Sequence, residues 1–137
     1  MKCASFKAEI SSVPEIQDFV KSSLYSKEKL SQKALMHVDL VIEELAMNII
    51  KHGFKDKKKG DIYIRVKSVF DGKKLYLTIF DNGVPFNPIE TKPPDIEAPI
   101  TEREPGGLGV FMVKQLAESI EYSREDGKNR LYIVMLL

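Results

Sequence analysis

The chain has 137 residues, 43% of them hydrophobic and 30% charged, so it suits one globular domain, spanning residues 1–137, with a buried core. Its 21 Lys and Arg residues nearly cancel its 20 Asp and Glu residues, which leaves no electrostatic case for direct binding of nucleic acid. No apolar run approaches the roughly 20 residues that span a bilayer, and the single cysteine, Cys3, cannot form an intrachain disulfide. We therefore expect a cytoplasmic protein with no membrane association.

The N-terminal part of the chain predicts one strand followed by two helices. Residues 4–10 alternate in polarity as a strand does. A first helix is expected over about 13–24, because Ser12 supplies a capping hydroxyl and a glutamate three residues later can reciprocate. A second helix, over about 28–51, carries a broad apolar stripe. Gly53 follows it at the position where a glycine in the left-handed conformation would end the helix.

The middle of the chain predicts a β-hairpin and a long loop. Residues 61–70 and 73–80 alternate in polarity or are β-branched, and Asp71-Gly72 between them is typical of a type I′ hairpin turn. Residues 91–105 are rich in proline and charge and lack apolar periodicity. They predict a loop inside the domain rather than a linker between two domains.

The C-terminal part predicts a third helix and two further strands. Residues 108–116 have a helical period, and 119–123 and 130–137 predict strands on either side of a turn at 126–129. The order is then strand, helix, helix, strand, strand, helix, strand, strand. This order predicts an α+β fold, a two-layer sandwich in which helices cover one face of a mixed, mostly antiparallel sheet.

The second helix carries polar groups that suit phosphate chemistry. Glu44, Asn48 and His52 are spaced four residues apart and so lie along one helix face. A carboxylate that accepts a proton and, one turn away, an amide oxygen that coordinates a hard cation form a sensible pair for metal-assisted phosphoryl transfer. The alternative is a solvated helix face with an incidental asparagine, in which His52 is a partly buried residue at the helix end.

A second candidate group follows the strand that ends at Phe80. The carboxylate of Asp81 lies at a strand end, where it can accept a hydrogen bond from an exocyclic amine, and Gly83 permits a positive φ and lets a flat ligand approach the backbone. The alternative is an ordinary Asn-Gly turn. Such a turn leads straight into a pairing strand, whereas residues 84–88 include two prolines that cannot continue a ladder.

A glycine cluster opens the third helix. Gly106, Gly107, Leu108 and Gly109 precede an apolar helical segment, so free backbone N–H groups at the helix N-terminus can cradle phosphates. The alternative is a helix start that tolerates glycine, because neither the dinucleotide nor the P-loop spacing is met. The preceding loop has the character of a lid over those phosphates, and its Arg103 is either a contact to the terminal phosphate or a solvated surface arginine.

Together these motifs carry a resemblance to a known family that covers nearly the whole chain. In order and placement they resemble the N, G1 and G2 boxes of the histidine-kinase-like (GHKL) ATPase superfamily: Glu44-x-x-x-Asn48, Asp81-x-Gly83 and Gly106-Gly-Leu-Gly109. Within it the chain is most similar to the anti-sigma-factor serine-protein kinases, whose small domains have a helix ending in Glu-x-x-x-Asn-x-x-x-His-Gly-aromatic, as residues 44–54 do here. The resemblance implies a Bergerat-type ATP-binding fold.

The resemblance also implies roles for the matching residues. Glu44 matches the general base that activates the attacking hydroxyl, and Asn48 matches the Mg²⁺ ligand of the ATP site. Asp81 matches the acceptor of the adenine amine, with Gly83 beside the base. Glu43 does not align with the general base, so we expect its side chain to face elsewhere.

Three glycines match the phosphate-facing turn of the family, Gly106, Gly107 and Gly109, and two residues depart from its wider pattern. Pro85 stands where many members repeat a glycine, which favours the anti-sigma subgroup. Asn129 lies near the position where many relatives have a threonine on the adenine side, and an amide can replace that hydroxyl.

The activity implied by the resemblance is that of an ATP- and Mg²⁺-dependent serine/threonine-protein kinase and anti-sigma-factor-like regulator. It would transfer the γ-phosphoryl group of ATP to a serine or threonine of an anti-anti-sigma antagonist protein. In that family the domain also binds a sigma factor, often as a homodimer. Two alternatives remain: a nucleotide-binding module that sequesters a partner without kinase activity, and a degenerate domain without nucleotide. Retention of Glu44 favours catalysis, because a module that only binds needs no base.

Overall fold

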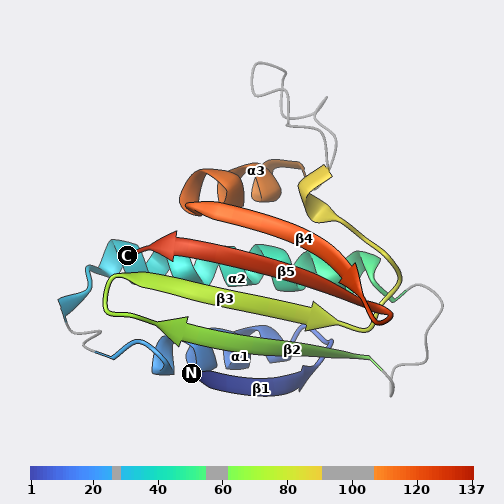
Figure 1. Cartoon of the computed structure of the whole chain (residues 1–137), viewed down its shortest axis with the longest axis horizontal. Helices are drawn as coiled ribbons and strands as arrows, with labels where there is room; N and C mark the ends of the chain where they lie inside the picture. The colour runs from blue at the N-terminus through green and yellow to red at the C-terminus, as the bar shows by residue number, and fades with distance from the viewer. Residues whose placement is uncertain (26–28, 55–61, 91–106) are drawn as a thin grey trace.

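The computed structural model describes residues 1–25, 29–54, 62–90 and 107–137. In these residues one sheet carries the α-helices on a single face, so the predicted α+β sandwich is confirmed (Figure 1). The described elements, with η3 a 3₁₀-helix, are β1 Lys2–Lys7, α1 Ser12–Ser22, α2 Gln32–His52, β2 Tyr63–Phe70, β3 Lys74–Asp81, η3 Pro88–Glu90, α3 Gly107–Leu116, β4 Ser119–Glu125 and β5 Lys128–Leu136.

The sheet has five strands in the order β1-β2-β3-β5-β4. All four pairings between neighbouring strands are antiparallel, so the described part of the sheet contains no parallel pair. The register aligns Ile64, Asp81, Asn129 and Arg124 in one row across four strands. Paired residues point to the same face of a sheet, so this row sets which side chains meet at the end of β3.

The core lies between the sheet and α2. The apolar stripe of α2 packs on the inward-facing residues of the strands, and the following are among the fully buried residues: Val38, Val41, Ile42, Leu45, Val66, Leu75, Leu77 and Ile133. Burying one such side chain stabilises the fold by about 1.5–3 kcal/mol. The stripe therefore fixes α2 on the sheet and sets the direction of its polar face. In the described residues, no helix has both the length and the apolar character needed to cross a bilayer.

The starts of the first two helices differ from the sequence prediction. The residue before α1 is Ser11, which makes no side-chain capping bond, and Ser12 lies inside the helix, so the predicted capping box is wrong. The preceding turn has already satisfied the first amides, because the N–H of Ser12 donates to the carbonyl of Glu9 at 3.0 Å. α2 begins later than predicted, because the Ser31 hydroxyl caps it by accepting from the N–H of Ala34 at 3.0 Å.

The two hairpins use different turns. A type I′ turn needs positive φ at both central residues. In the β2–β3 turn only Gly72 has positive φ, +93°, so the predicted type I′ geometry is wrong there. The Asp71 carboxylate instead accepts from the N–H groups of Lys73, in the turn, and of Lys74, the first residue of β3. The paired positive φ values occur in the β4–β5 turn, at Asp126 (51°) and Gly127 (73°).

Candidate functional site

One end of the candidate site is the buried carboxylate of Asp81, the last residue of β3. Its side chain is only 3% exposed. One carboxylate oxygen, Oδ1, accepts from the N–H of Gly83 at 2.9 Å and from the Asn129 amide at 3.0 Å. These two bonds fix the carboxylate at the end of the strand, where the sequence analysis placed it.

Gly83 is packed against the C-terminal end of α2. The N–H of Val84 donates to the carbonyl of Gly53 at 2.7 Å, and a β-carbon on Gly83 would overlap that carbonyl oxygen. Gly83 is not among the described glycines with positive φ, so its expected use of positive φ is wrong, and close packing of two backbones is what requires glycine. Gly53 has φ −83°, so the left-handed helix end expected there is also wrong.

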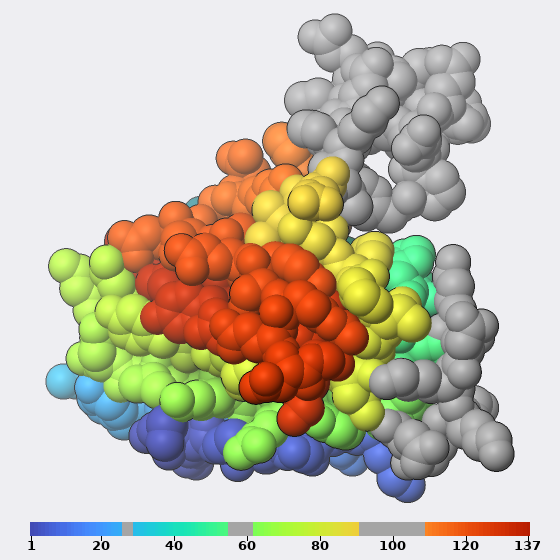
Figure 2. Space-filling model, turned by 45° about the vertical axis from the view of Figure 1, so that its right-hand side comes forward, coloured from blue at the N-terminus to red at the C-terminus, as the bar shows by residue number. Residues whose placement is uncertain are grey.

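The segment that follows Gly83 is held from two sides. The ring of Phe86 stacks on that of His52 at the end of α2, with ring centroids 5.0 Å apart. The N–H of Phe86 donates to the side-chain oxygen of Asn129 at 3.3 Å. Figure 2 shows the yellow segment after β3 between the red β4–β5 hairpin and the green end of α2. The segment is thereby fixed beside Asp81.

Two residues of this region, Tyr122 and Arg124, are functional candidates that sequence reasoning missed. The Tyr122 hydroxyl donates to Asn129 Oδ1, and Arg124 Nη1 donates to the same oxygen at 3.2 Å and to the Gly83 carbonyl at 2.9 Å. The sequence could have indicated Arg124, because a two-residue turn at Asp126-Gly127 places Arg124 opposite Asn129 in the hairpin.

The other end of the candidate site lies between α2 and the first turn of α3. The carboxyl group of Glu44 is so close to Gly109 that a β-carbon on this glycine would overlap it. Gly107 and Leu108 form the start of the same helix. A carboxylate at a helix N-terminus is electrostatically favourable, typically by about 0.3–1 kcal/mol. Glu43 is exposed on the helix surface, whereas Glu44 is partly buried.

Asn48 lies one helical turn from Glu44 and is 8% exposed. Its side-chain nitrogen is buried without a hydrogen-bond partner within the described residues. A buried polar group without a partner costs about 1–3 kcal/mol, so it fits a site that a polar ligand completes.

A magnesium ion bound with ATP fits this donor set. In the described residues no cluster of three or more His, Cys, Asp or Glu side chains can hold a metal. Mg²⁺ often keeps several waters and binds through one or two protein oxygens together with substrate phosphates. The Asn48 amide oxygen is a donor of that kind. Two of the predicted ATP-site residues, Arg103 and Gly106, lie outside the described residues.

The two ends are joined by α2. Gly53 is nine positions after Glu44, which is about 13 Å along a helix axis. Gly53 lies beside Asp81, since a β-carbon on Gly53 would be 3.8 Å from the Asp81 Oδ1. This separation suits a nucleoside triphosphate whose base lies at Asp81 and whose terminal phosphate lies near Glu44.

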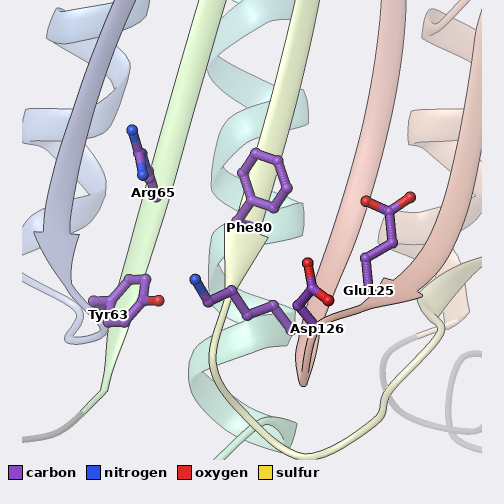
Figure 3. Close-up of a pocket in the computed structure, with 6 residues that line it drawn as sticks. Tyr63, Arg65, Phe80, Glu125 and Asp126 are labelled. Atoms are coloured by element: carbon purple, nitrogen blue, oxygen red, sulfur yellow. The ribbon is translucent and has the colours of Figure 1, made fainter.

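Two other hollows lie away from these residues. One of about 140 Å³ is on the sheet face opposite the helices, where Figure 3 shows Tyr63, Arg65, Phe80, Glu125 and Asp126 around it. The other, of about 460 Å³, is lined by residues 7–11, Ile50, Phe54 and Ile62. Neither contains a residue of the three motifs.

A two-layer α+β sandwich with these motifs on α2, at the end of β3 and at the start of α3 defines the class of histidine kinase-like ATPases. The model of the histidine kinase-like ATPase domain family matches residues 6–135, so the chain belongs to that family. It is 24% identical over 105 residues to the serine/threonine-protein kinase BtrW of Bordetella bronchiseptica, covering 77% of this chain and 72% of the relative. It is 27% identical over 111 residues to the serine-protein kinase RsbW of Listeria monocytogenes, covering 77% and 69%.

Solved structures share the fold. The histidine kinase domain of the Erythrobacter litoralis EL346 blue-light activated kinase superposes with a TM-score of 0.53 at 22% identity, over 77% of this chain but only 45% of that chain. The catalytic domain of histidine kinase ThkA superposes with a TM-score of 0.51 at 14% identity, over 99% of this chain and 97% of that domain. At these identities the likeness is to the fold alone, and it confirms the predicted architecture.

Proposed function

We propose that the protein is a cytoplasmic, ATP- and Mg²⁺-dependent serine/threonine-protein kinase of the anti-sigma-factor type. The observation that carries this proposal is the Glu44 carboxylate, held against the first turn of α3 and one helical turn from the buried amide of Asn48, whose side-chain nitrogen has no hydrogen-bond partner within the described residues. The names of the relatives, serine-protein kinase RsbW and serine/threonine-protein kinase BtrW, support the same reading.

In this proposal the adenine binds at the end of β3. The Asp81 carboxylate accepts a hydrogen bond from the exocyclic amine of the base. Gly83 keeps the backbone beside it free of a β-carbon, and its own position is set by the backbone contact with Gly53. The base is thereby recognised by a buried charged acceptor, which rejects analogues that leave the acceptor unpaired.

The phosphates bind at the start of α3. The N–H groups of Gly106, Gly107, Leu108 and Gly109 face them, and the positive end of the helix dipole favours their charge. Arg103 contacts the terminal phosphate. The Asn48 oxygen would hold Mg²⁺, which when bound would neutralise charge on the phosphate oxygens.

Glu44 then acts as the general base. Its carboxylate takes the proton of a serine or threonine hydroxyl as that oxygen bonds to the γ-phosphorus. The bond from the γ-phosphorus to its bridging oxygen breaks, and ADP leaves with the electron pair. The products are a phosphorylated side chain, ADP and a proton on Glu44, which passes to solvent.

The acceptor in this proposal is an anti-anti-sigma antagonist protein, and the domain also binds a sigma factor, as a homodimer. These partners come from the family resemblance, and the relatives named serine-protein kinase RsbW support a serine as the acceptor. A second candidate function is a binding module that holds ATP and sequesters its partner without kinase activity.

The test is phosphoryl transfer from labelled ATP to candidate antagonist proteins. Glu44→Gln is expected to reduce transfer about 10²- to 10⁴-fold, the range typical of a general base, while ATP binding is retained. Glu43→Gln is the matched control, because this neighbouring carboxylate is exposed, and it should leave transfer unchanged. Nucleotide binding is checked by unfolding with Mg-ATP, which at 100 times its dissociation constant adds about 2.7 kcal/mol. Binding without transfer, with Glu44→Gln having no effect, would establish the binding module instead.

A further inference from the structure

Asn129 makes five hydrogen bonds to described residues near the proposed base end of the site. It is 3% exposed. Its Nδ2 donates to Asp81 Oδ1 at 3.0 Å and to the Val84 carbonyl at 2.7 Å. Its Oδ1 accepts from the Phe86 N–H, from the Tyr122 hydroxyl and from Arg124.

These bonds use the whole hydrogen-bonding capacity of the amide. An asparagine side chain has two N–H donors and an oxygen with two lone pairs. Both donors of Asn129 are used within the protein, and its oxygen is shared by three donors. No donor remains for a ligand, so Asn129 has no N–H group with which to contact the adenine directly.

The surroundings also fix which way the amide points. Phe86 presents a backbone N–H, and Arg124 has no acceptor atoms, so the side-chain oxygen must face them. The opposite side presents a carboxylate oxygen and a backbone carbonyl, which must face the amide nitrogen. A flipped amide would place donor against donor and acceptor against acceptor.

The fixed amide in turn fixes Asp81. Its Oδ1 accepts two N–H bonds, from Asn129 and Gly83, so this oxygen carries no proton and the carboxylate cannot rotate without losing both bonds. Arg124 adds a second connection, because it also holds the Gly83 carbonyl at 2.9 Å. The orientation of the acceptor and the path of the following turn are thus set by one cluster.

We propose that Asn129, supported by Tyr122 and Arg124, is a positioning residue for adenine: it acts through Asp81 and sets the direction in which this carboxylate meets the exocyclic amine. The proposal rests on the proposed nucleotide site. It predicts that loss of Asn129 removes discrimination between purines that have a 6-amino group and purines that lack one, and leaves phosphate binding intact.

The test compares three ligands on the full chain in the presence of Mg²⁺: ATP, purine riboside triphosphate, which lacks the 6-amino group, and inorganic tripolyphosphate, which lacks the base. Hydrogen bonds to a charged acceptor are strong enough to give at least roughly tenfold preference for ATP over purine riboside triphosphate in the wild type. Asn129→Ala should reduce this preference to less than about threefold while tripolyphosphate binds as before. Asp81→Asn should also abolish the preference for ATP. Adding Asn129→Ala to Asp81→Asn should then lower the affinity for ATP by less than about a further twofold.

The outcomes separate the two proposals. A wild type that binds neither triphosphate overturns the nucleotide site and this inference with it. A wild type that prefers ATP, together with an Asn129→Ala variant that keeps the preference, overturns only the positioning role. Equal loss of tripolyphosphate and ATP binding in the variant also overturns it, because the role would then be general stability. Asn129→Thr, which retains one hydroxyl donor, should keep part of the preference and provides the test if the alanine variant does not fold.

Discussion

The carboxyl group of Glu44 on α2 lies against the α-carbon of Gly109 on α3, in the space that a β-carbon at this glycine would occupy. The absence of a side chain at Gly109 therefore allows the two helices to approach at this point. It also places a negative charge at the N-terminal turn of α3, where the helix dipole stabilises it. One contact thus sets both the packing of α3 and the position of the proposed base.

Gly109→Ala should separate these two effects. The atoms that obstruct the new methyl group are the far end of a flexible glutamate, which can turn aside, so we expect the free energy of unfolding to fall by less than about 1 kcal/mol. The displaced carboxylate should no longer meet the acceptor hydroxyl, and misplacement by about 1 Å can cost 10²-fold in rate. Urea unfolding and single-turnover phosphoryl transfer measure the two quantities. Equal losses in ATP affinity and transfer would contradict a role of this contact in placing the base.

Gly83→Ala should, in contrast, lower the stability of the fold substantially. Its β-carbon would meet the backbone carbonyl of Gly53, which is fixed by the end of α2 and cannot turn aside. We expect the free energy of unfolding to fall by about 1–3 kcal/mol, as for other overpacked sites, together with weaker ATP binding. Gly127→Ala is the control for a glycine with positive φ and open space around it. A Gly83→Ala variant as stable as the wild type would show that the Gly53 contact is not tight.

The local parts of this fold were open to prediction from the sequence. The apolar stripe of α2, the alternating strands of the β2–β3 hairpin and the order of the elements follow from periodicity, which local side-chain patterns determine. The three motifs fall where the prediction places them: Glu44 and Asn48 on one helix, Asp81 at a strand end and Gly109 in the first turn of a helix.

The parts that were missed depend on contacts between distant segments. No local pattern shows that the Gly53 carbonyl meets the amide of Val84, or that Gly83 is needed for that approach rather than for positive φ. The pairing of Arg124 with Asn129 follows from the turn at Asp126-Gly127, but no local pattern shows that Arg124 also reaches the Gly83 carbonyl. The capping prediction at Ser12 failed because a preceding backbone turn had already satisfied the helix amides.

Substitution of the two serines that precede the first helices should show which of them stabilises its helix. Ser31 accepts a hydrogen bond from the N–H of Ala34, whereas Ser11 makes no side-chain capping bond. Ser31→Ala should therefore lower the free energy of unfolding by about 0.5–2 kcal/mol, and Ser11→Ala should have little effect. Chemical denaturation of both variants tests this. Equal effects would mean that the Ser31 bond contributes nothing beyond the intrinsic preferences of the residues.

The β2–β3 turn should give the protein part of its acid sensitivity. Hydrogen bonds from the backbone N–H of Lys74 and then of Lys73 lower the pKa of the Asp71 carboxyl. A group whose pKa is lower in the folded state stabilises the fold above its unfolded pKa of about 3.9, and this contribution is lost as pH falls through the folded pKa. Asp71→Asn should therefore lose less stability than the wild type between about pH 5 and pH 2. Urea midpoints across this range measure the slope, with Asp126→Asn in the other hairpin turn as the matched control.

Asn48→Leu should raise the stability of the fold and abolish the binding of Mg-ATP. The Asn48 side-chain nitrogen is buried without a partner in the described residues, and leucine has a similar branched shape without the polar group. Removing this unsatisfied buried N–H group should raise the free energy of unfolding by about 1–3 kcal/mol. Ser68→Ala is the contrasting control, because Ser68 is also buried but its hydroxyl shares a 2.6 Å hydrogen bond with Ser23, so its loss should destabilise.

The same Asn48→Leu variant tests the proposed metal ligand. Without the amide oxygen, added Mg-ATP should no longer stabilise the protein, whereas the wild type should gain about 2.7 kcal/mol at 100 times its dissociation constant. Thermal unfolding with Mg-ATP, and with ATP and a chelator, measures the gain and its dependence on the metal. A variant that is more stable and still stabilised by Mg-ATP as strongly as the wild type would remove Asn48 from the metal site. A less stable variant would show that the amide has a partner that holds the fold together.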